Sequence, residues 1–87
     1  MASARFPLVR VTWLDPTGPT VKWTKLEKLA RGEPTTIVSI GHLIRDDDIL
    51  IILPHLSADD EGFGEIVIPK GVVVSKEILA PPAESHL

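Results

Sequence analysis

Residues 35–53, TTIVSIGHLIRDDDILIIL, form two apolar runs that are separated by three consecutive aspartates. In the first run, alternate positions share one side of an extended chain: Val38, Ile40, His42 and Ile44. Such alternation is the pattern of a β-strand. The second run, residues 49–53, is apolar at every position and predicts a central strand that is covered on both faces. The aspartates predict a charged turn, so the two runs are expected to form a hairpin.

A strand is also predicted on the N-terminal side of this hairpin. Residues 8–14 alternate, with Val9, Val11 and Trp13 on one side. The segment DPTGP at residues 15–19 ends the strand, because two prolines and a glycine cannot continue a ladder. The preceding residues, 1–7, are expected to be a flexible N-terminal segment.

The C-terminal part predicts two more strands. Residues 54–63 are expected to form a polar loop, after which residues 64–68 alternate again. The sequence Pro69-Lys70-Gly71 predicts a very tight turn before a last strand at residues 72–79. Residues 80–87 contain two prolines and are expected to be a loose tail.

One short helix is predicted after the first strand. Thr24 followed by Glu27 is a capping box, and Gly32 stands where a left-handed C-terminal cap is expected. On such a helix Leu26, Leu29 and Ala30 share one face. Because so short a helix is not stable alone, we expect this leucine face to dock on the sheet.

The order of elements is therefore strand, helix and four further strands within one domain, residues 8–79. Consecutive antiparallel strands of this number close most simply into a small five-stranded barrel. An open sheet covered by the helix is the alternative. The chain has 87 residues, which is at most one domain.

Composition narrows the function classes. The chain has no cysteine, which excludes disulfides, a thiol nucleophile and a Cys-ligated zinc. Its longest apolar run is residues 49–54, too short to span a membrane, and no apolar stretch follows the N-terminal residues as in a secretory signal. We expect a cytoplasmic protein without a membrane partner.

The charge is unevenly distributed along the chain. The net charge is −3, which argues against a dedicated nucleic-acid binder. Residues 1–31 nevertheless carry six Lys or Arg and two acids, whereas residues 32–87 carry three and ten. A molecule with such poles can attract a negative partner at one end or another copy of itself head to tail.

The stretch from Ile40 to Gly71 resembles the Sm and LSm proteins, which are small SH3-like barrels. Gly41, Leu43 and Asp47 stand at the spacing of their first motif, G-x-L-x-x-x-D, and Lys70-Gly71 followed by three valines matches their second. The resemblance implies a bent strand at Gly41, a hairpin capped by Asp47 and a sharp corner at Gly71.

Two features depart from the Sm pattern. Ile51 replaces the asparagine that reads an RNA base, and the helix follows the first strand instead of preceding it. The resemblance therefore implies the scaffold without its RNA recognition. The chain is also similar to small proteins of tailed phages, with Trp13 in the first strand, Trp23 before a short helix and an Ile-Pro-Lys corner. A phage origin would imply the host cytoplasm.

The residues favour a protein that is not an enzyme and needs no cofactor. Ser39 and His42 lie on opposite sides of one strand, and Ser57 and His55 lie in a loop, so neither pair predicts a preorganised triad. A hydrolytic or metal-dependent activity near His55 is the weakest hypothesis. A metal site would have to combine the acidic loops with His42, His55 or His86, and we expect none.

A basic set near the predicted helix is the candidate nucleic-acid site. Its members are Arg10, Lys22, Trp23, Lys25, Lys28 and Arg31. The cations could contact phosphates while Trp23 stacks on a base. The favoured interpretation is a solvated helix face with Trp23 packed beneath it in the core.

The last strands predict self-association. Residues along them are apolar on both faces, with few charges, and the expected oligomer edge comprises Ile66, Ile68, Val72 and Val74. A monomer would normally blunt such edges. In Sm-like proteins these edges pair between neighbours and close a ring, so a homo-oligomer is the first hypothesis. RNA or nucleotide binding is the alternative.

Overall fold

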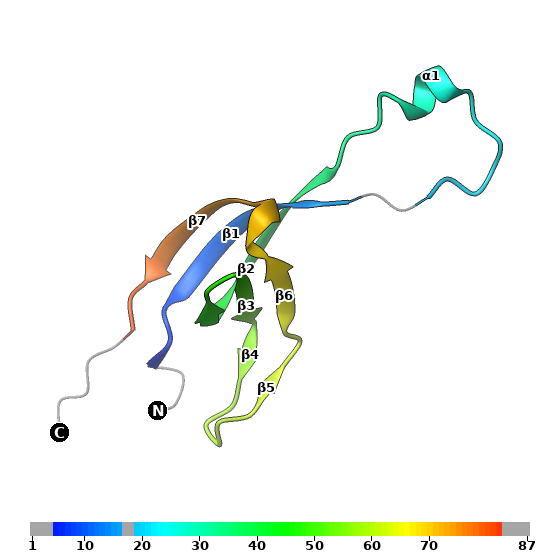
Figure 1. Ribbon diagram of the computed structural model, residues 1–87. Helices are drawn as coiled ribbons and strands as arrows, with labels where there is room; N and C mark the ends of the chain where they lie inside the picture. Colours follow the sequence, from blue (N-terminus) through cyan, green and yellow to red (C-terminus); the bar gives the residue numbers. More distant parts are fainter. Residues whose placement is uncertain (1–4, 17–18, 83–87) are drawn as a thin grey trace, which may run out of the picture.

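A computed structural model describes residues 5–16 and 19–82. Its main feature is one antiparallel five-stranded sheet with the strand order β6-β3-β2-β1-β7 (Figure 1). The strands are β1 (Leu8–Asp15), β2 (Thr35–Asp46), β3 (Ile49–Leu53), β6 (Ile66–Pro69) and β7 (Val73–Ala80). The expected class is confirmed: the protein is mostly β, with a single short α-helix, α1 (Leu26–Leu29), after the first strand in the described part.

The register places β1 at the centre of one half of the sheet. β1 pairs with β2 from Leu8↔His42 to Asp15↔Thr35, and on its other side with β7, where two register shifts interrupt the ladder. β2 is longer than β1 and continues past it to pair with β3, which pairs in turn with β6. The long strand therefore joins the two halves of the sheet.

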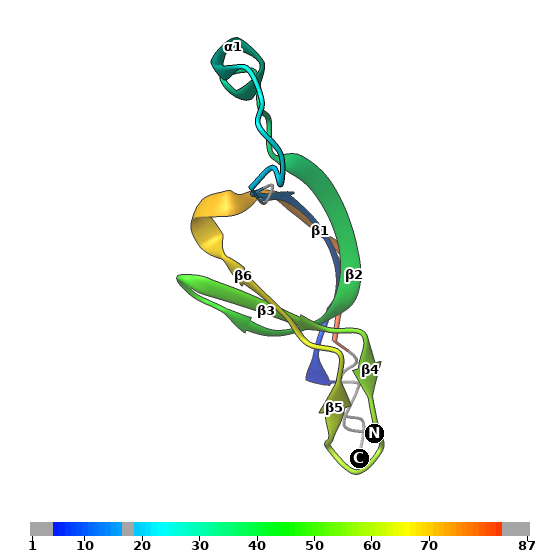
Figure 2. The same ribbon diagram turned by 90° about the vertical axis from the view of Figure 1, so that its right-hand side faces the viewer.

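The sheet curls strongly but does not close. Figure 2 shows β3 and β6 brought across from β1, so the two halves of the sheet face each other. A 3-10 helix, η2 (Lys70–Val72), connects β6 to β7. The described strands contain no β6–β7 pairing, so the expected barrel is open along this line. One physical reason is that β6 has only four residues and ends at Pro69, which has no N–H to donate to a ladder.

The core lies between the two halves of the sheet. Five side chains are fully buried there: Val9, Val11, Leu50, Ile52 and Ile68. They come from β1, β3 and β6, so the core exists only because the sheet curls onto itself. Trp13 packs against this cluster, as the alternation of β1 predicts, and its indole N–H donates to the Ser39 hydroxyl oxygen at 3.1 Å.

β2 turns its smaller side chains inward. Gly41 and Ser39 lie opposite Val9 and Val11 in the ladder, whereas Val38 and Ile40 are exposed on the outside. The close approach of another strand requires this arrangement. A Cβ atom on Gly41 would lie 3.0 Å from the backbone N and C atoms of Leu53.

The predicted helix is shorter than expected and does not dock. α1 begins at Leu26 and has no buried residue. It lies near the end of a long excursion between β1 and β2, which we call the arm (residues 16–34; Figure 1). The leucine face is therefore not packed on the sheet, and Trp23 is not a core residue.

The predicted caps of this helix are also absent. The N-cap is Lys25, with no side-chain hydrogen bond, and the Thr24 hydroxyl donates instead to the Lys22 carbonyl at 3.0 Å. The C-cap is Ala30 in a right-handed conformation, and Gly32 does not adopt a positive φ. Without these bonds and without tertiary contacts, only one turn of helix forms.

The arm makes the molecule elongated. The radius of gyration is 17.1 Å, whereas a compact domain of this length has about 12 Å. The longest dimension is 64 Å against 22 and 19 Å for the others.

Two segments that were predicted as loop and turn are structured differently. Residues 54–63 contain a second, two-stranded sheet, β4 (His55–Leu56) paired with β5 (Gly62–Phe63). The tight turn predicted at Pro69-Lys70-Gly71 takes the form of the 3-10 helix η2, in which Gly71 does not adopt a positive φ. A one-turn helix of this kind reverses the chain without the left-handed residue that a glycine would supply.

The expected terminal segments lie mostly outside the described residues, which exclude 1–4 and 83–87. At the N-terminal side, the Pro7 carbonyl accepts a hydrogen bond from the Leu43 N–H at 2.9 Å, and Arg5 pairs with Asp60. No helix in the described residues has the length and apolar character needed to cross a membrane.

Candidate interaction surfaces

The two outermost strands, β6 and β7, are the predicted oligomer edge. Each has one neighbour in the sheet, so its outer row of backbone N–H and C=O groups has no ladder partner in the described part of the chain. Unpaired edges of this kind are ready templates for another strand. The side chains predicted to mark the edge differ in burial. Ile68 is in the core, Ile66 and Val72 are half-buried, and Val74 is 60% exposed.

Few charges protect these edges. β6 carries none, and β7 carries Lys76 and Glu77. Glu77 forms an ion pair with Arg10 on the neighbouring strand β1. Arg10, which was predicted to contact phosphate, is therefore already paired within the sheet. Arg10 therefore lies apart from the other members of the predicted nucleic-acid site, which are on the arm.

Asp46 ties the end of β2 to the opposite edge of the sheet. Its carboxylate accepts hydrogen bonds from the ammonium groups of Lys70 in η2 and Lys76 in β7. These bonds lower the pKa of the Asp46 carboxyl below its usual value, and the bond from Lys70 has the larger effect. We call these three residues the Asp46 clamp. It joins β2 to η2 and to β7, with which β2 has no ladder pairing.

The residues predicted as motif positions lie in β2, in the β2–β3 turn and in η2. Gly41 is at the close approach to Leu53, and Leu43 packs against the core. Asp47 caps the β2–β3 hairpin as expected: its carboxylate accepts the Ile49 N–H at 2.9 Å and the Arg45 side chain at 2.9 Å. These two bonds lower the pKa of the Asp47 carboxyl. Lys70 and Gly71 form η2.

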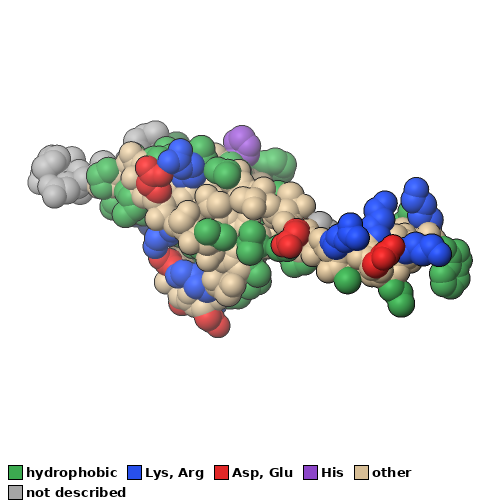
Figure 3. Space-filling view, turned by 90° about the horizontal axis from the view of Figure 1, so that it is seen from above, with side chains coloured by type: hydrophobic (Ala, Val, Ile, Leu, Met, Phe, Trp, Pro, Cys, Tyr) green, Lys and Arg blue, Asp and Glu red, His purple; other side chains and the backbone are tan. Residues whose placement is uncertain are grey.

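The arm presents the remaining members of the basic set. Lys22, Trp23, Lys25, Lys28 and Arg31 are all exposed, and none of the four cations forms an ion pair within the described residues. Trp23 is completely exposed. Figure 3 shows cationic and apolar side chains together along the arm and at its far end. The structure therefore brings five of the six predicted residues together.

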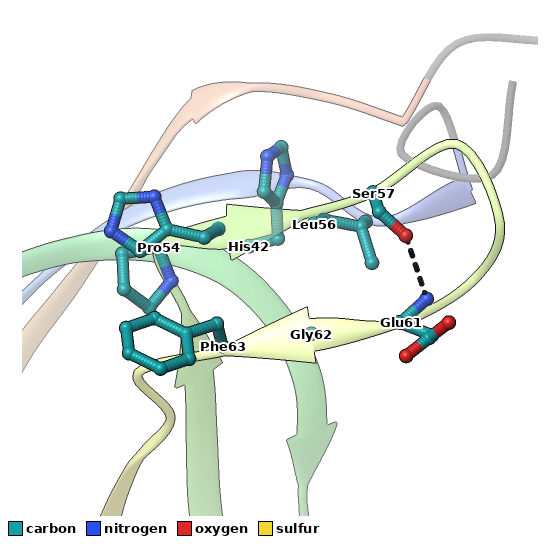
Figure 4. Close-up of a pocket in the computed structure, with 8 residues that line it drawn as sticks. His42, Pro54, Leu56, Ser57, Glu61, Gly62 and Phe63 are labelled. Carbon is teal, nitrogen blue, oxygen red and sulfur yellow. Dashed lines mark hydrogen bonds between the residues drawn. The ribbon is translucent and has the colours of Figure 1, made fainter.

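A shallow hollow lies beside the β4–β5 hairpin (Figure 4). Among its lining residues are His42, His55, Ser57 and Glu61. The Ser57 hydroxyl accepts the backbone N–H groups of Asp59 at 3.2 Å and Glu61 at 3.1 Å, which closes the turn. His55 instead lies against the Phe63 ring, with centroids 6.0 Å apart. No described hydrogen bond joins this serine to a histidine base, and the arrangement offers no triad.

No metal centre is evident in residues 5–16 and 19–82, where no three His, Asp or Glu side chains gather to hold an ion. His86, which was considered as a ligand, lies outside the described residues.

A second hollow was not predicted from the sequence. It is an apolar trough of about 420 Å³ on the outside of β2, β3 and β6. Its apolar lining includes Phe6, Ile44, Ile51, Leu56 and Val67. Three charged residues also line it, Arg5, Asp60 and Glu65, of which Arg5 and Asp60 form an ion pair. The signal was present as the apolar character of both faces of residues 49–53, but sequence alone does not say which neighbours share the outer face.

Comparisons of the chain with protein-family models, with curated proteins and with solved structures found no match. The functional proposals below therefore rest on the surfaces described above.

Proposed function

We propose that this protein is a non-catalytic small β-module that self-associates through the edges of its sheet, with an Sm-like scaffold. The observation that carries the proposal is the pair of unpartnered outer strands, β6 and β7, in a sheet that curls without closing. Pairing the β7 edge of one copy with the β6 edge of the next would satisfy both rows of backbone groups.

The small core supports the same proposal. Only five side chains are fully buried in residues 5–16 and 19–82, and Val74 and Ile78 on β7 are each about 60% exposed. An 87-residue chain has a thin stability margin, and covering apolar surface by association stabilises the folded form. The pairing is heterologous, because two different edges meet, so repeated pairing closes a ring where the rotation allows it.

The test compares two matched valines. Val74→Lys places a charge on the free edge strand, whereas Val38→Lys places the same charge on β2, which is not one of the two outermost strands of the sheet. The two valines are 60% and 58% exposed, so the substitutions disturb burial equally. At micromolar concentration we expect the native protein and Val38→Lys to show the same multiple of the 9.5 kDa chain mass by light scattering, and Val74→Lys to show a smaller mass because its edge pairing is lost. A native protein that is monomeric at micromolar concentration contradicts the proposal.

A second candidate function is binding of single-stranded nucleic acid or a nucleotide by the arm. The observation in its favour is the complete exposure of Trp23 beside cations that form no ion pair in the part of the chain that the structure describes. Bases stack on exposed aromatic rings, and phosphates attract lysines. Binding of this kind weakens steeply with salt. Titration of the protein with a fluorescent oligonucleotide at low and at physiological salt tests it, and no binding at low salt ends it.

A further inference from the structure

The far part of the arm carries an apolar cluster that its own sheet does not cover. Val21 and Trp23 are completely exposed, Leu26 is 82% exposed, and Leu29 is also exposed. The four side chains line one open hollow of about 440 Å³. We call this cluster the arm tip. Large apolar side chains gathered in this way mark an interaction site on a monomer surface.

A rim of positive charge surrounds the arm tip. Residues 19–34 contain four basic and two acidic side chains, a net charge of +2 in a chain whose total is −3. The rest of the chain therefore carries −5. Since the basic side chains have no ion-pair partner in the described structure, their charge is available to an acidic surface.

The trough on β2, β3 and β6 is also apolar, and its three charged lining residues, Arg5, Asp60 and Glu65, carry a net charge of −1. Its floor is formed by Ile44, Ile51 and Val67, which are half-buried or exposed on the outer face of the sheet. Glu65 beside it has no ion-pair partner within the described residues.

The two surfaces lie at opposite ends of the molecule. The arm leaves the sheet where Asp15 pairs with Thr35, whereas the trough lies beyond the other end of this ladder, near Leu8↔His42. The arm extends away from the sheet (Figures 1 and 3), so one chain cannot bring its arm tip to its own trough.

We infer that the arm tip of one copy docks in the trough of a second copy, with Trp23 as the apolar anchor and the arm cations facing Glu65. This contact is different from the β6–β7 edge pairing and does not require it. It joins unlike surfaces, so it propagates head to tail. Its position on the outer face of β6 makes it continuous with the edge that the proposed pairing would bury.

The composition of the arm tip favours a protein partner over a nucleic acid. Bases stack on aromatic rings, and Trp23 is the only aromatic side chain in residues 19–34. Val21, Leu26 and Leu29 are aliphatic, and they are better matched by the Ile and Val floor of the trough. Tryptophan in an apolar pocket is also a typical hot spot of protein interfaces.

The decisive experiment measures the head-to-tail contact with the edge pairing removed. In a Val74→Lys background, Trp23→Ala is expected to weaken the remaining association at least about 30-fold, as measured by sedimentation equilibrium. The reason is that a tryptophan buried at an interface is a typical hot spot, whose truncation removes a large part of the binding free energy. In a Trp13→Phe protein with native edges, Trp23 is the sole tryptophan, and its emission should shift to the blue as concentration rises.

A charge exchange provides a test that leaves both tryptophans in place. Lys25→Glu should weaken association, and adding Glu65→Lys to the same chain should restore it. The matched control is Glu61→Lys, which makes the same charge change at an exposed residue that does not line the trough, and it should not rescue Lys25→Glu.

Three outcomes overturn the inference. The first is association that is unaffected by Trp23→Ala, and the second is a Val74→Lys protein that shows no association at high concentration. The third is a Trp23 emission that responds to a single-stranded oligonucleotide while the chain mass stays that of a monomer. If edge pairing fails but the Trp23-dependent association persists, only the proposed function is contradicted.

Discussion

The curled sheet and the arm handle their apolar side chains in opposite ways. In the sheet, Leu50 and Ile52 are fully buried against β1, whereas in the arm Leu26 and Trp23 are exposed. Both regions have turn signals and apolar residues at regular spacing in the sequence. The difference is that the strands of the sheet pack against one another, while the arm has no second layer to pack against.

This difference separates stability from recognition. The sheet holds the whole of the described core, so the free energy of folding must come from it. The arm leaves apolar area exposed, and ordering its residues costs conformational entropy. Neither favours folding of the isolated chain. The exposed arm therefore gives the monomer no stability, which agrees with the binding role proposed above.

The largest expected effect on stability comes from comparing a Leu→Ala substitution in the sheet with one in the arm. Leu50→Ala should reduce the free energy of unfolding by about 2–5 kcal/mol, because it leaves a cavity in a core of five side chains. Leu26→Ala should change it by less than about 0.5 kcal/mol, because that side chain is 82% exposed. Urea unfolding measures the contrast, with both variants at protein concentrations too low for association. Equal losses would show that the arm is packed.

A smaller loss is expected at the bend of the sheet. Gly41→Ala should cost about 1–3 kcal/mol, because the new Cβ would press on the backbone of Leu53. Gly71→Ala is the matched control, since a Cβ there meets no atom within 4 Å. Thermal unfolding compares the two. An unchanged Tm for Gly41→Ala would mean that β2 and β3 can separate without loss.

Removing the arm should stabilise the sheet slightly. Asp15 and Thr35 lie directly opposite each other, so a short Gly-rich turn can replace residues 16–34. We expect about 1 kcal/mol of added stability, because closing the shorter loop costs less entropy. Denaturant titration measures this gain, and the excised protein should keep its β-sheet circular dichroism. A protein that unfolds without the arm would contradict the division into two regions.

The smallest expected effect concerns the Asp46 clamp. Asp46→Asn should lower stability by about 0.2–1 kcal/mol at neutral pH, because it weakens two partly exposed ion pairs. The pKa of Asp46 is lowered in the folded state, so the stabilisation is present above the ordinary value of about 3.9. It is lost as the pH falls through the folded-state value.

The difference between native protein and Asp46→Asn should therefore disappear in acid. Unfolding measured from pH 7 to pH 2 tests this, with Asp48→Asn as a control whose side chain is 88% exposed. A difference that persists at pH 2 would assign the effect to packing and not to charge.

Much of the sheet was predictable because local patterns carry it. The strands at residues 8–14 and 49–53 were predicted within one residue of β1 and β3. The Asp47 cap was also predictable, because a short carboxylate two residues before Ile49 reaches that N–H within the turn. The structure also gathers five of the six predicted nucleic-acid residues on the arm, although their partner stays a prediction.

The errors concern contacts between distant elements. The leucine face of residues 26–30 was predicted to dock, yet a helical pattern indicates only that a face is apolar and not what covers it. Residues 54–63 are polar enough for a loop, but β4 and β5 pair there because the Ser57–Glu61 turn aligns them. The trough was missed because its lining combines β2, β3 and β6 with the N-terminal segment and the β4–β5 hairpin.

Alternation and turn chemistry, which are local properties, determined that this chain forms five antiparallel strands with one short helix after the first. Which side of β2 faces the core was decided only by the tertiary structure. The side with Val38 and Ile40 is the more apolar, yet the side with Ser39 and Gly41 is inside, because the curl brings the Leu53 backbone to Gly41. Space, and not hydrophobicity alone, sets the inner face at a sharp bend. For the same reason, only the fold could show that the sheet stays open and the arm stands free.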